Sequence, residues 1–175
     1  SLQSLQQQTA QGFEVVFVDY GSDAAYASAV KSVVAGFDFA GYHYIAHPGL
    51  LWNKSKALNY GASKAKGAFI FVADVDICFD SNAVKTMLSM ANESKFCLFK
   101  LSYLKQEVTQ AQIASRNFSE SQIKHHGEVN GMILVSQTNF FSVEGYDEFY
   151  HFYGSEDIDL YERLINNGME VCKNS

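Results

Sequence analysis

The chain has 175 residues, of which 47% are hydrophobic and 18% are charged, and its formal net charge is −6. This length suits one domain, and the composition is that of a globular protein, which excludes a disordered chain. A broad negative charge repels nucleic-acid backbones, and no run approaches the ~20 apolar residues of a membrane helix. We therefore expect no nucleic-acid partner, and a phosphate-bearing ligand would need a bound cation or a helix N-terminus.

Hydrophobic periodicity predicts strands and helices that alternate along the chain. The first are a helix tail at 3–8, a strand at 13–19, a helix at 23–35, a short strand at 42–47 ended by Pro48 and Gly49, and a helix at 54–66. There follow a strand at 69–74, a helix at 82–92, a strand at 95–103, a loop or mobile helix within 105–128, a strand at 131–135 and helices at 138–143 and 155–167. The apolar strand at 69–74 is typical of a parallel sheet covered by helices on both faces. The sum is an open α/β sheet, in which ligands bind beyond the carboxyl ends of the strands.

The remaining reactive side chains carry little signal. Cys78, Cys97 and Cys172 lie far apart and form no CxxC pair, so we expect reduced, mostly buried thiols. We expect His125 and His126 to be solvated loop residues. No signal-peptide pattern is present, which favours a cytoplasmic location and leaves the inner face of the membrane open.

Two aspartates, Asp74 and Asp76, follow the most apolar predicted strand. Strand alternation puts both carboxylates on one side, with Val75 turned the other way. Hard oxygen ligands so placed suit Mg²⁺ or Mn²⁺, which commonly bridge to substrate phosphates. The alternative is a solvated strand end whose aspartates cap the next turn.

A third acid, Asp19, ends the first predicted strand and is followed by a turn signal at 20–22. Gly21 permits a tight turn, and an acid at a strand end can accept a hydrogen bond from a sugar or a base. The alternative is an ordinary strand-to-helix turn in which Ser22 or Asp23 caps the helix.

The segment 154–159 opens the last predicted helix, with Ser155 as its expected N-cap and Glu156 and Asp157 in its first turn. The helix dipole stabilises such acids by about 0.3–1 kcal/mol each, so capping alone can explain them. A helix N-terminus also keeps a carboxylate ionised and able to accept a proton. Aromatic residues precede this helix and either stack on a sugar ring or belong to the core. They are Phe149, Tyr150, Phe152 and Tyr153.

Taken together, these sites occur in the order found in the GT-A glycosyltransferases. The chain resembles the family 2 enzymes, the chondroitin-polymerase type and the β1,4-galactosyltransferases. The resemblance lies in FEVVFVDYGS at 13–22, WNKSKALNYG at 52–61, DVD at 74–76, GYDE at 145–148 and FYGSEDID at 152–159. The last three are similar to the metal-binding DxD, the GGFDE turn and the WGGEDxD segment. The resemblance implies a GT-A (nucleotide-diphospho-sugar transferase) fold, a Rossmann-like α/β sheet with flanking helices, as a single glycosyltransferase catalytic domain over 1–175.

The same resemblance implies a role for each acid. Asp157 would be the general base and Glu156 would hold the acceptor or position the donor sugar. Asp76 would bind Mn²⁺ or Mg²⁺, and Asp74 would join it or contact the donor's ribose or sugar. The nucleotide of a UDP-sugar would be bound by Asp19 at its base and by Gly21, Lys54, Lys56 and Asn59. The implied reaction is an inverting transfer to a glycan acceptor, in polysaccharide biosynthesis.

Three features depart from the family pattern. Only the tail of the helix after the family's first strand is visible, in residues 1–8, and the chain ends at Ser175 before the family's downstream His ligand. We therefore expect a domain cut short at both ends, with an incomplete metal site, and a membrane-associated partner could act through the missing segments. Phe152 and Tyr153 replace a tryptophan-rich version, which leaves the donor and acceptor sugars open.

Two other functions stay open at this point. A sugar-phosphate nucleotidyltransferase would need a glycine-rich phosphate loop near its N-terminus, and none is visible. A non-catalytic sugar- or partner-binding module could keep the same scaffold, although the acids at 74, 76, 156 and 157 argue against it.

Overall fold

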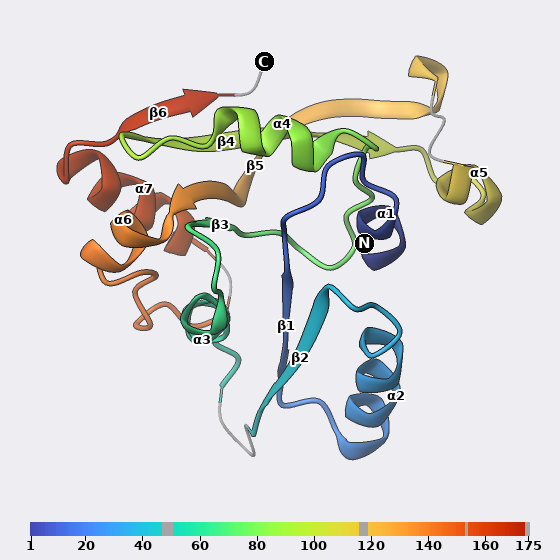
Figure 1. The fold of residues 1–175 in the computed structure, drawn as a ribbon, viewed down its shortest axis with the longest axis horizontal. Coiled ribbons are helices and arrows are strands. Elements are labelled where there is room, and N and C mark those ends of the chain that lie inside the picture. The colour runs from blue at the N-terminus through green and yellow to red at the C-terminus, as the bar shows by residue number, and fades with distance from the viewer. Residues whose placement is uncertain (47–50, 116–118, 153, 174–175) are drawn as a thin grey trace.

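The computed structural model describes residues 1–46, 51–115, 119–152 and 154–173, and its strands form two sheets (Figure 1). The first sheet pairs β1 (Val15–Tyr20) with β2 (Ala40–Ile45); the second has the order β3 (Phe69–Phe71), β5 (Ile123–Ser136), β4 (Lys95–Leu104), β6 (Glu170–Lys173). The helices are α1 (Leu2–Gln6), α2 (Ala24–Val34), α3 (Lys54–Lys64), α4 (Ala83–Met90), α5 (Gln110–Ser115), α6 (Gln137–Ser142) and α7 (Glu156–Asn166), with a 3-10 turn at Glu120–Gln122. Within these described ranges, no helix has the length and apolar character needed to cross a membrane.

The β1–β2 pair is parallel, and α2 is the crossover that joins its two strands. The side chain of Asp23 caps α2, because its Oδ1 accepts hydrogen bonds from the backbone N–H of Ala25 and Tyr26, both at 3.1 Å. On the other side, α3 approaches β1 so closely that a β-carbon at Gly61 would lie 3.0 Å from Cγ2 of Val18. Side-chain packing of α3 therefore ties this small sheet to the rest of the chain.

The second sheet is mixed, which corrects the expected parallel arrangement of the strand at 69–74. β5 runs antiparallel to both β3 and β4, while β4 and β6 are parallel. β3 also ends at Phe71, before the aspartates. The strand is continuously apolar because both faces of the sheet are covered, as expected. Ile70 belongs to the core on one face, and Phe71 packs against the core on the other. Burial on both faces makes a strand continuously apolar in either direction, so the pattern cannot reveal whether its neighbours are parallel.

Each face of the second sheet has its own hydrophobic core. One core lies under α6 and α7 and contains the fully buried Phe96, Ile133 and Leu160. The other lies under α4 and contains Phe99 and Met132. Neighbouring residues of β4 and β5 alternate between the two cores, as expected for strands covered on both sides.

Residues 105–128 differ from the expectation, because β5 already starts at Ile123. His125 stacks on Tyr103 with ring centroids 4.4 Å apart, and Nδ1 of His126 lies 2.9 Å from Oγ of Ser102. Both histidines are exposed, as expected, but they belong to a strand and not to a loop. This stretch is solvated, so it lacks the hydrophobic alternation by which a strand is recognised.

The three cysteines are free thiols, as expected. Only Cys97 is fully buried, whereas Cys78 and Cys172 are half-buried, so the expectation of mostly buried thiols holds in part. The predicted break at Pro48 and Gly49 lies outside the described residues.

Candidate active site

Four charged side chains from three separate segments converge near the start of α3. Nζ of Lys54, the first residue of α3, lies 3.6 Å from Oδ1 of Asp74 and 3.9 Å from Oε1 of Glu156. A β-carbon at Gly131 of β5 would lie 3.4 Å from the same Nζ and 3.3 Å from Oδ2 of Asp157. Asp74 and the adjacent pair Glu156 and Asp157, which lie about 80 residues apart in the sequence, therefore surround one lysine.

The loop before α3 fixes the position of Lys54. Oδ1 of Asn53 accepts a hydrogen bond from the backbone N–H of Lys56 at 2.7 Å and so caps the helix. Nδ2 of the same residue donates to the backbone carbonyl of Glu148 at 2.7 Å. The backbone N–H of Phe152 also donates to the carbonyl of Trp52 at 3.1 Å. The start of α3 is thus joined to the segment that leads into α7.

The start of α7 is not capped in the way that the sequence predicts, and its two acids, Glu156 and Asp157, are buried. Ser155 is at the N-cap position with a φ of +69°, but its hydroxyl makes no capping hydrogen bond, contrary to the expectation. Instead, Oε2 of Glu156 accepts a hydrogen bond from the backbone N–H of Gly154 at 3.2 Å. The side chain of Glu156 is only 5% exposed, and Asp157 beside it is buried as well. Two buried acids turned toward a lysine exceed what helix capping requires.

Asp157 has the most perturbed carboxyl group of the cluster. Burial raises its pKa to about 6, Lys54 opposes this rise, and the negative charges of Glu156 and Asp74 add to it. Its Oδ1 is buried and has no hydrogen-bond partner among the described residues. A carboxylate with a pKa near neutral and an unoccupied oxygen is suited to accept a proton from a bound hydroxyl.

The two aspartates expected to bind a metal are split between two environments. Both follow β3 in irregular chain, with Val75 and Asp76 in a turn, so strand alternation does not apply to them. Asp74 contacts Lys54, whereas Asp76 is exposed and has no hydrogen bond or ion pair within the described residues. No group of three or more His, Cys, Asp or Glu side chains there is arranged to hold a metal ion. Two accessible carboxylates still fit Mg²⁺ or Mn²⁺, because these ions commonly take their other ligands from water and substrate phosphates.

Asp19 forms a second polar site at the end of β1. It is 5% exposed, and its two oxygens accept hydrogen bonds from the backbone N–H of Ser22 at 3.0 Å and from the hydroxyl of Tyr42 at 2.7 Å. Gly21 has a φ of +81° and makes the tight turn that the sequence predicts. Because Asp23 caps α2, Asp19 is not needed for capping.

The end of β1 lies beside the loop that leads into α3. The rings of Tyr20 and Trp52 meet edge to face with centroids 5.3 Å apart. The end of β1 that carries Asp19 is therefore joined, through Tyr20, to the loop that leads to Lys54.

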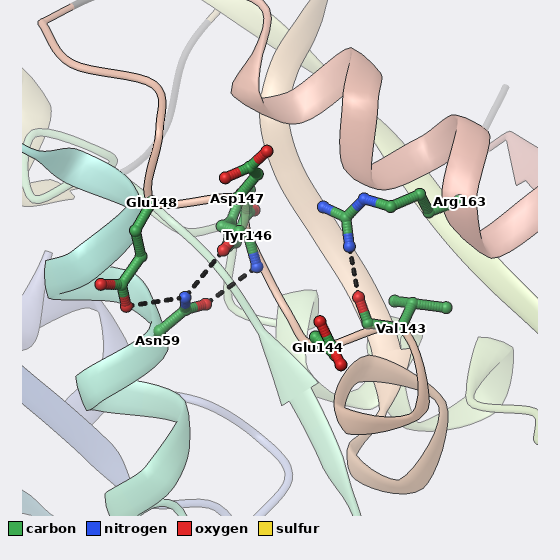
Figure 2. A pocket seen from close by; sticks show the side chains of 7 residues that line it. All are labelled: Asn59, Val143, Glu144, Tyr146, Asp147, Glu148 and Arg163. Carbon is green, nitrogen blue, oxygen red and sulfur yellow. Dashed lines mark hydrogen bonds between the residues drawn. The ribbon is translucent and has the colours of Figure 1, made fainter.

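Two residues expected to bind the nucleotide, Lys56 and Asn59, make no side-chain contact with the charged cluster in the described part of the chain. Lys56 is exposed, and only its backbone takes part in the helix cap. Asn59 bonds the backbone carbonyl and N–H of Tyr146, both at 2.8 Å, and Oε1 of Glu148 at 3.1 Å. The amide of Asn59 thus holds the turn at 144–148, as Figure 2 shows.

A pocket of about 380 Å³ lies along that turn, between Asn59 and Arg163 (Figure 2). Arg163 borders it and is engaged with Asp159 at 2.6 Å and with the carbonyls of Val143 and Gly145. The pocket does not include Lys54 or Asp157, and its one cation is already paired. We therefore place the candidate active site at the charged cluster and not in this pocket. The pocket is lined by Asn59, Val143, Glu144, Tyr146, Asp147, Glu148 and Arg163.

The sequence did not reveal three further residues around Asp157. Gly131 has a φ of +103°, and its N–H donates a hydrogen bond to the hydroxyl of Tyr161 at 3.0 Å. The hydroxyl of Tyr146 is buried without a hydrogen-bond partner in the described part of the chain, and burial together with Asp157 raises its pKa well above the ordinary value. Only Gly131 carried a usable signal, since a glycine inside a strand often marks a close approach.

With this geometry established, the comparisons with known proteins identify the family. The model of glycosyl transferase family 2 matches residues 1–148. The chain belongs to glycosyl transferase family 2. No curated protein matches the sequence. The match stops short of Glu156 and Asp157, so the roles expected for these two acids stay predictions.

Solved structures share the fold of this family 2 chain at low sequence identity. Residues 1–349 of S. aureus TarS match with a TM-score of 0.69 and 16% identity, over 99% of this chain and 52% of that one. GalNAc-T7 with UDP, GalNAc and Mn²⁺ matches at 0.58 and 11% identity, over 97% and 37%. The catalytic domain of Drosophila beta1,4-galactosyltransferase 7 in complex with xylobiose matches at 0.55 and 17% identity, over 93% and 65%. This chain thus spans 37–65% of the length of these structures.

These findings confirm the main expectations from the sequence. The fold is that of the GT-A glycosyltransferases, a β1,4-galactosyltransferase is among the similar structures, and the matched residues 1–148 are a glycosyl transferase family 2 domain. The comparisons do not specifically show the expected similarity to the chondroitin-polymerase type.

Proposed function

We propose that this domain, residues 1–175, is the catalytic part of an inverting enzyme that transfers a hexose or N-acetylhexosamine from a UDP-sugar to a hydroxyl of a glycan or polysaccharide. The observation that carries the proposal is Asp157, a buried carboxyl with a pKa of about 6 that faces Lys54 across Gly131. Such a group is ionised at neutral pH but still binds a proton readily, as a general base must.

The proposed reaction needs one proton acceptor and one departing group. Asp157 takes the proton of the acceptor hydroxyl while that oxygen forms a bond to the anomeric carbon. The bond from this carbon to the diphosphate breaks, and its electron pair leaves with UDP. Because the acceptor attacks from the side opposite to the leaving group, the configuration at the anomeric carbon inverts. Glu156, held by the N–H of Gly154, positions the acceptor or the donor sugar.

The donor would lie between the two polar sites. Asp19 and the turn at Gly21 would receive the base, and Lys54 would lie near the diphosphate. Asp74 and Asp76 would hold a Mg²⁺ or Mn²⁺ ion, which offsets the charge of the leaving diphosphate. The description of GalNAc-T7 with UDP, GalNAc and Mn²⁺ supports this assignment. Lys56 stays a predicted diphosphate contact, while we assign Asn59 to the turn that it bonds.

The test of the base is the variant Asp157→Asn, compared with Glu162→Gln on the exposed side of the same helix. Release of UDP is measured with a panel of UDP-hexoses and UDP-N-acetylhexosamines in the presence of oligosaccharide acceptors. Asp157→Asn should lower kcat by roughly 10²–10⁴-fold and leave UDP binding intact, whereas Glu162→Gln should retain full activity. Full activity in Asp157→Asn would exclude it as the base.

The test of the donor site is thermal unfolding with UDP, with and without Mn²⁺. Saturation at about 100 times Kd adds roughly 2.7 kcal/mol, or on the order of 5–10 °C in Tm for a chain of this size. The shift should need the metal and should disappear in Asp76→Ala. A metal-independent shift would remove the ion from the proposal, and the lack of any shift with UDP would remove the donor site.

A further inference from the structure

The carboxylate of Asp19 is nearly closed off and already holds two hydrogen-bond donors. The hydroxyl of Tyr42 donates to its Oδ2 at 2.7 Å, and the backbone N–H of Ser22 donates to its Oδ1 at 3.0 Å. Asp19 is 5% exposed, so these donors replace most of the water that an aspartate would otherwise bind. The first donor comes from β2 and the second from the turn that Asp19 itself begins.

A neighbouring tyrosine contacts the same turn without touching the acid. The hydroxyl of Tyr44, two residues further along β2, donates to the backbone carbonyl of Ser22 at 3.0 Å. Tyr42 and Tyr44 therefore both hold the turn to β2, but only Tyr42 acts on the carboxylate of Asp19. Tyr44→Phe therefore serves as a matched control for Tyr42→Phe, because it removes a hydrogen bond to the same turn without touching the carboxylate of Asp19.

We infer that the hydroxyl of Tyr42 is a positioning group that keeps Asp19 a fixed, acceptor-only carboxylate, and thereby decides which nucleobase edge the site accepts. The inference rests on the proposed role of Asp19 at the base. Each carboxylate oxygen keeps further lone-pair capacity, and all of it accepts hydrogen bonds. The site therefore favours a base with a ring N–H, such as uracil, and disfavours cytosine, which presents an unprotonated ring nitrogen at the same place.

The electrostatics of the site agree with this assignment. Burial raises the pKa of Asp19, but the hydrogen bonds from Tyr42 and Ser22 outweigh it and leave the pKa below its ordinary value. Burial and the bond to Asp19 raise the pKa of Tyr42 to about 12, so Tyr42 stays a protonated donor at any working pH. The acid should thus remain ionised across the neutral and mildly acidic range.

Other titratable groups on the packed elements are engaged elsewhere. On β2, His43 meets the ring of Tyr60 from α3 with centroids 6.3 Å apart, and Tyr44 bonds the backbone of the turn. Lys54 of α3 lies beside Asp74 and Glu156. None of these side chains bonds Asp19, so removing the hydroxyl of Tyr42 takes away the donor that β2 supplies and leaves the acid with the hydrogen bonds from Ser22 in its own turn.

The test uses uridine and cytidine, because nucleosides carry no phosphate and need no metal. Binding is measured by NMR titration for the parent, Tyr42→Phe and Tyr44→Phe at about pH 8 and about pH 5. The parent and Tyr44→Phe should prefer uridine equally at both pH values. Tyr42→Phe should raise the pKa of Asp19, because the bond from Tyr42 lowers it, and should bind uridine several-fold more weakly at the lower pH. The preference of this variant for uridine over cytidine should shrink at the lower pH, because a protonated Asp19 donates a hydrogen bond to the ring nitrogen of cytosine.

A second readout separates this inference from the proposed function. The carboxyl carbon of Asp19 is titrated by ¹³C NMR in the same three proteins without ligand. If Tyr42→Phe leaves that titration unchanged, the inference is wrong even where uridine binds the parent. If the titration shifts but no nucleoside binds the parent, the base-binding role of Asp19 is wrong. Asp19→Asn serves as the second variant: a retained preference for uridine in it would also overturn the inference, whether or not Tyr42→Phe folds.

Discussion

Replacing Asp157 with Asn should stabilise the folded domain at about pH 8, although it removes the proposed base. The pKa of the buried carboxyl is about 6 against an ordinary value of 3.8, a rise of about 2 units. Keeping it ionised in the fold thus costs up to about 3 kcal/mol. Because the folded pKa is the higher one, the stabilising effect of the bound proton is full below about pH 4 and is lost as the pH rises through about 6. Asparagine removes this cost.

The measurement is thermal unfolding of the parent, Asp157→Asn and Glu162→Gln between about pH 5 and about pH 8. At the upper limit, Asp157→Asn should gain up to about 3 kcal/mol, or roughly 6–12 °C in Tm. At the lower limit the parent binds the proton, and the difference should narrow by about 1.4 kcal/mol. Glu162→Gln, which is exposed, should show no such trend.

The pH trend decides whether the reasoning is correct. A difference that does not change with pH, or an asparagine variant less stable than the parent at about pH 8, would mean that burial and the neighbouring acids do not disfavour the ionised form. Asp157 would then have an ordinary pKa and would be a weaker candidate for the base.

Three further changes test the surroundings of the site by unfolding experiments. Gly131→Ala combines a positive φ with a β-carbon 3.3 Å from Asp157, so it should cost more stability than Gly168→Ala, which has a φ of +89° and open space. An equal loss in both would assign the effect to backbone strain alone. Tyr146→Phe removes a buried hydroxyl that has no described partner, and should leave the unfolding free energy unchanged or raise it by about 1 kcal/mol. A loss of more than about 1 kcal/mol would reveal a hydrogen bond to that hydroxyl. Asn59→Ala removes both bonds to the backbone of Tyr146 and should cost roughly 2–4 kcal/mol in chemical denaturation. An unchanged denaturation midpoint would show that the turn at 144–148 is stable without the hydrogen bonds from Asn59.

The sequence predicted the order of the elements because most of them bury one clear face. The helices at α2, α3, α4 and α7 and the strands β1, β2 and β4 lie within a few residues of their expected places. The acids of the site were also recognisable, since Asp19 lies one residue before the end of β1 and Glu156 and Asp157 open a helix. Local signals of this kind depend on the neighbouring residues alone.

What the sequence could not supply depends on pairing between distant segments. An apolar run such as β3 reports burial on both faces but not the direction of β5 beside it. β6 has 4 residues, too few for a periodic pattern. Tyr42 meets Asp19 only through the register of β1 against β2, and Asn59 meets Tyr146 across the space between α3 and a later turn. The specific role of each site residue stays a prediction until the variants are measured.

The division of the strands into two sheets has a consequence for cooperativity. Within the described residues no ladder of hydrogen bonds crosses from β1 to β3, so the β1–β2 pair is held to the larger sheet by side chains, chiefly those of α3. Segments attached in this way can open without global unfolding, and their amide hydrogens then exchange sooner. A ligand that contacts both Asp19 and Lys54 would join the two parts. Its binding should therefore slow hydrogen exchange in β1 and β2 far more than in the already buried β4 and β5, which makes exchange in the small sheet a direct reporter of donor occupancy.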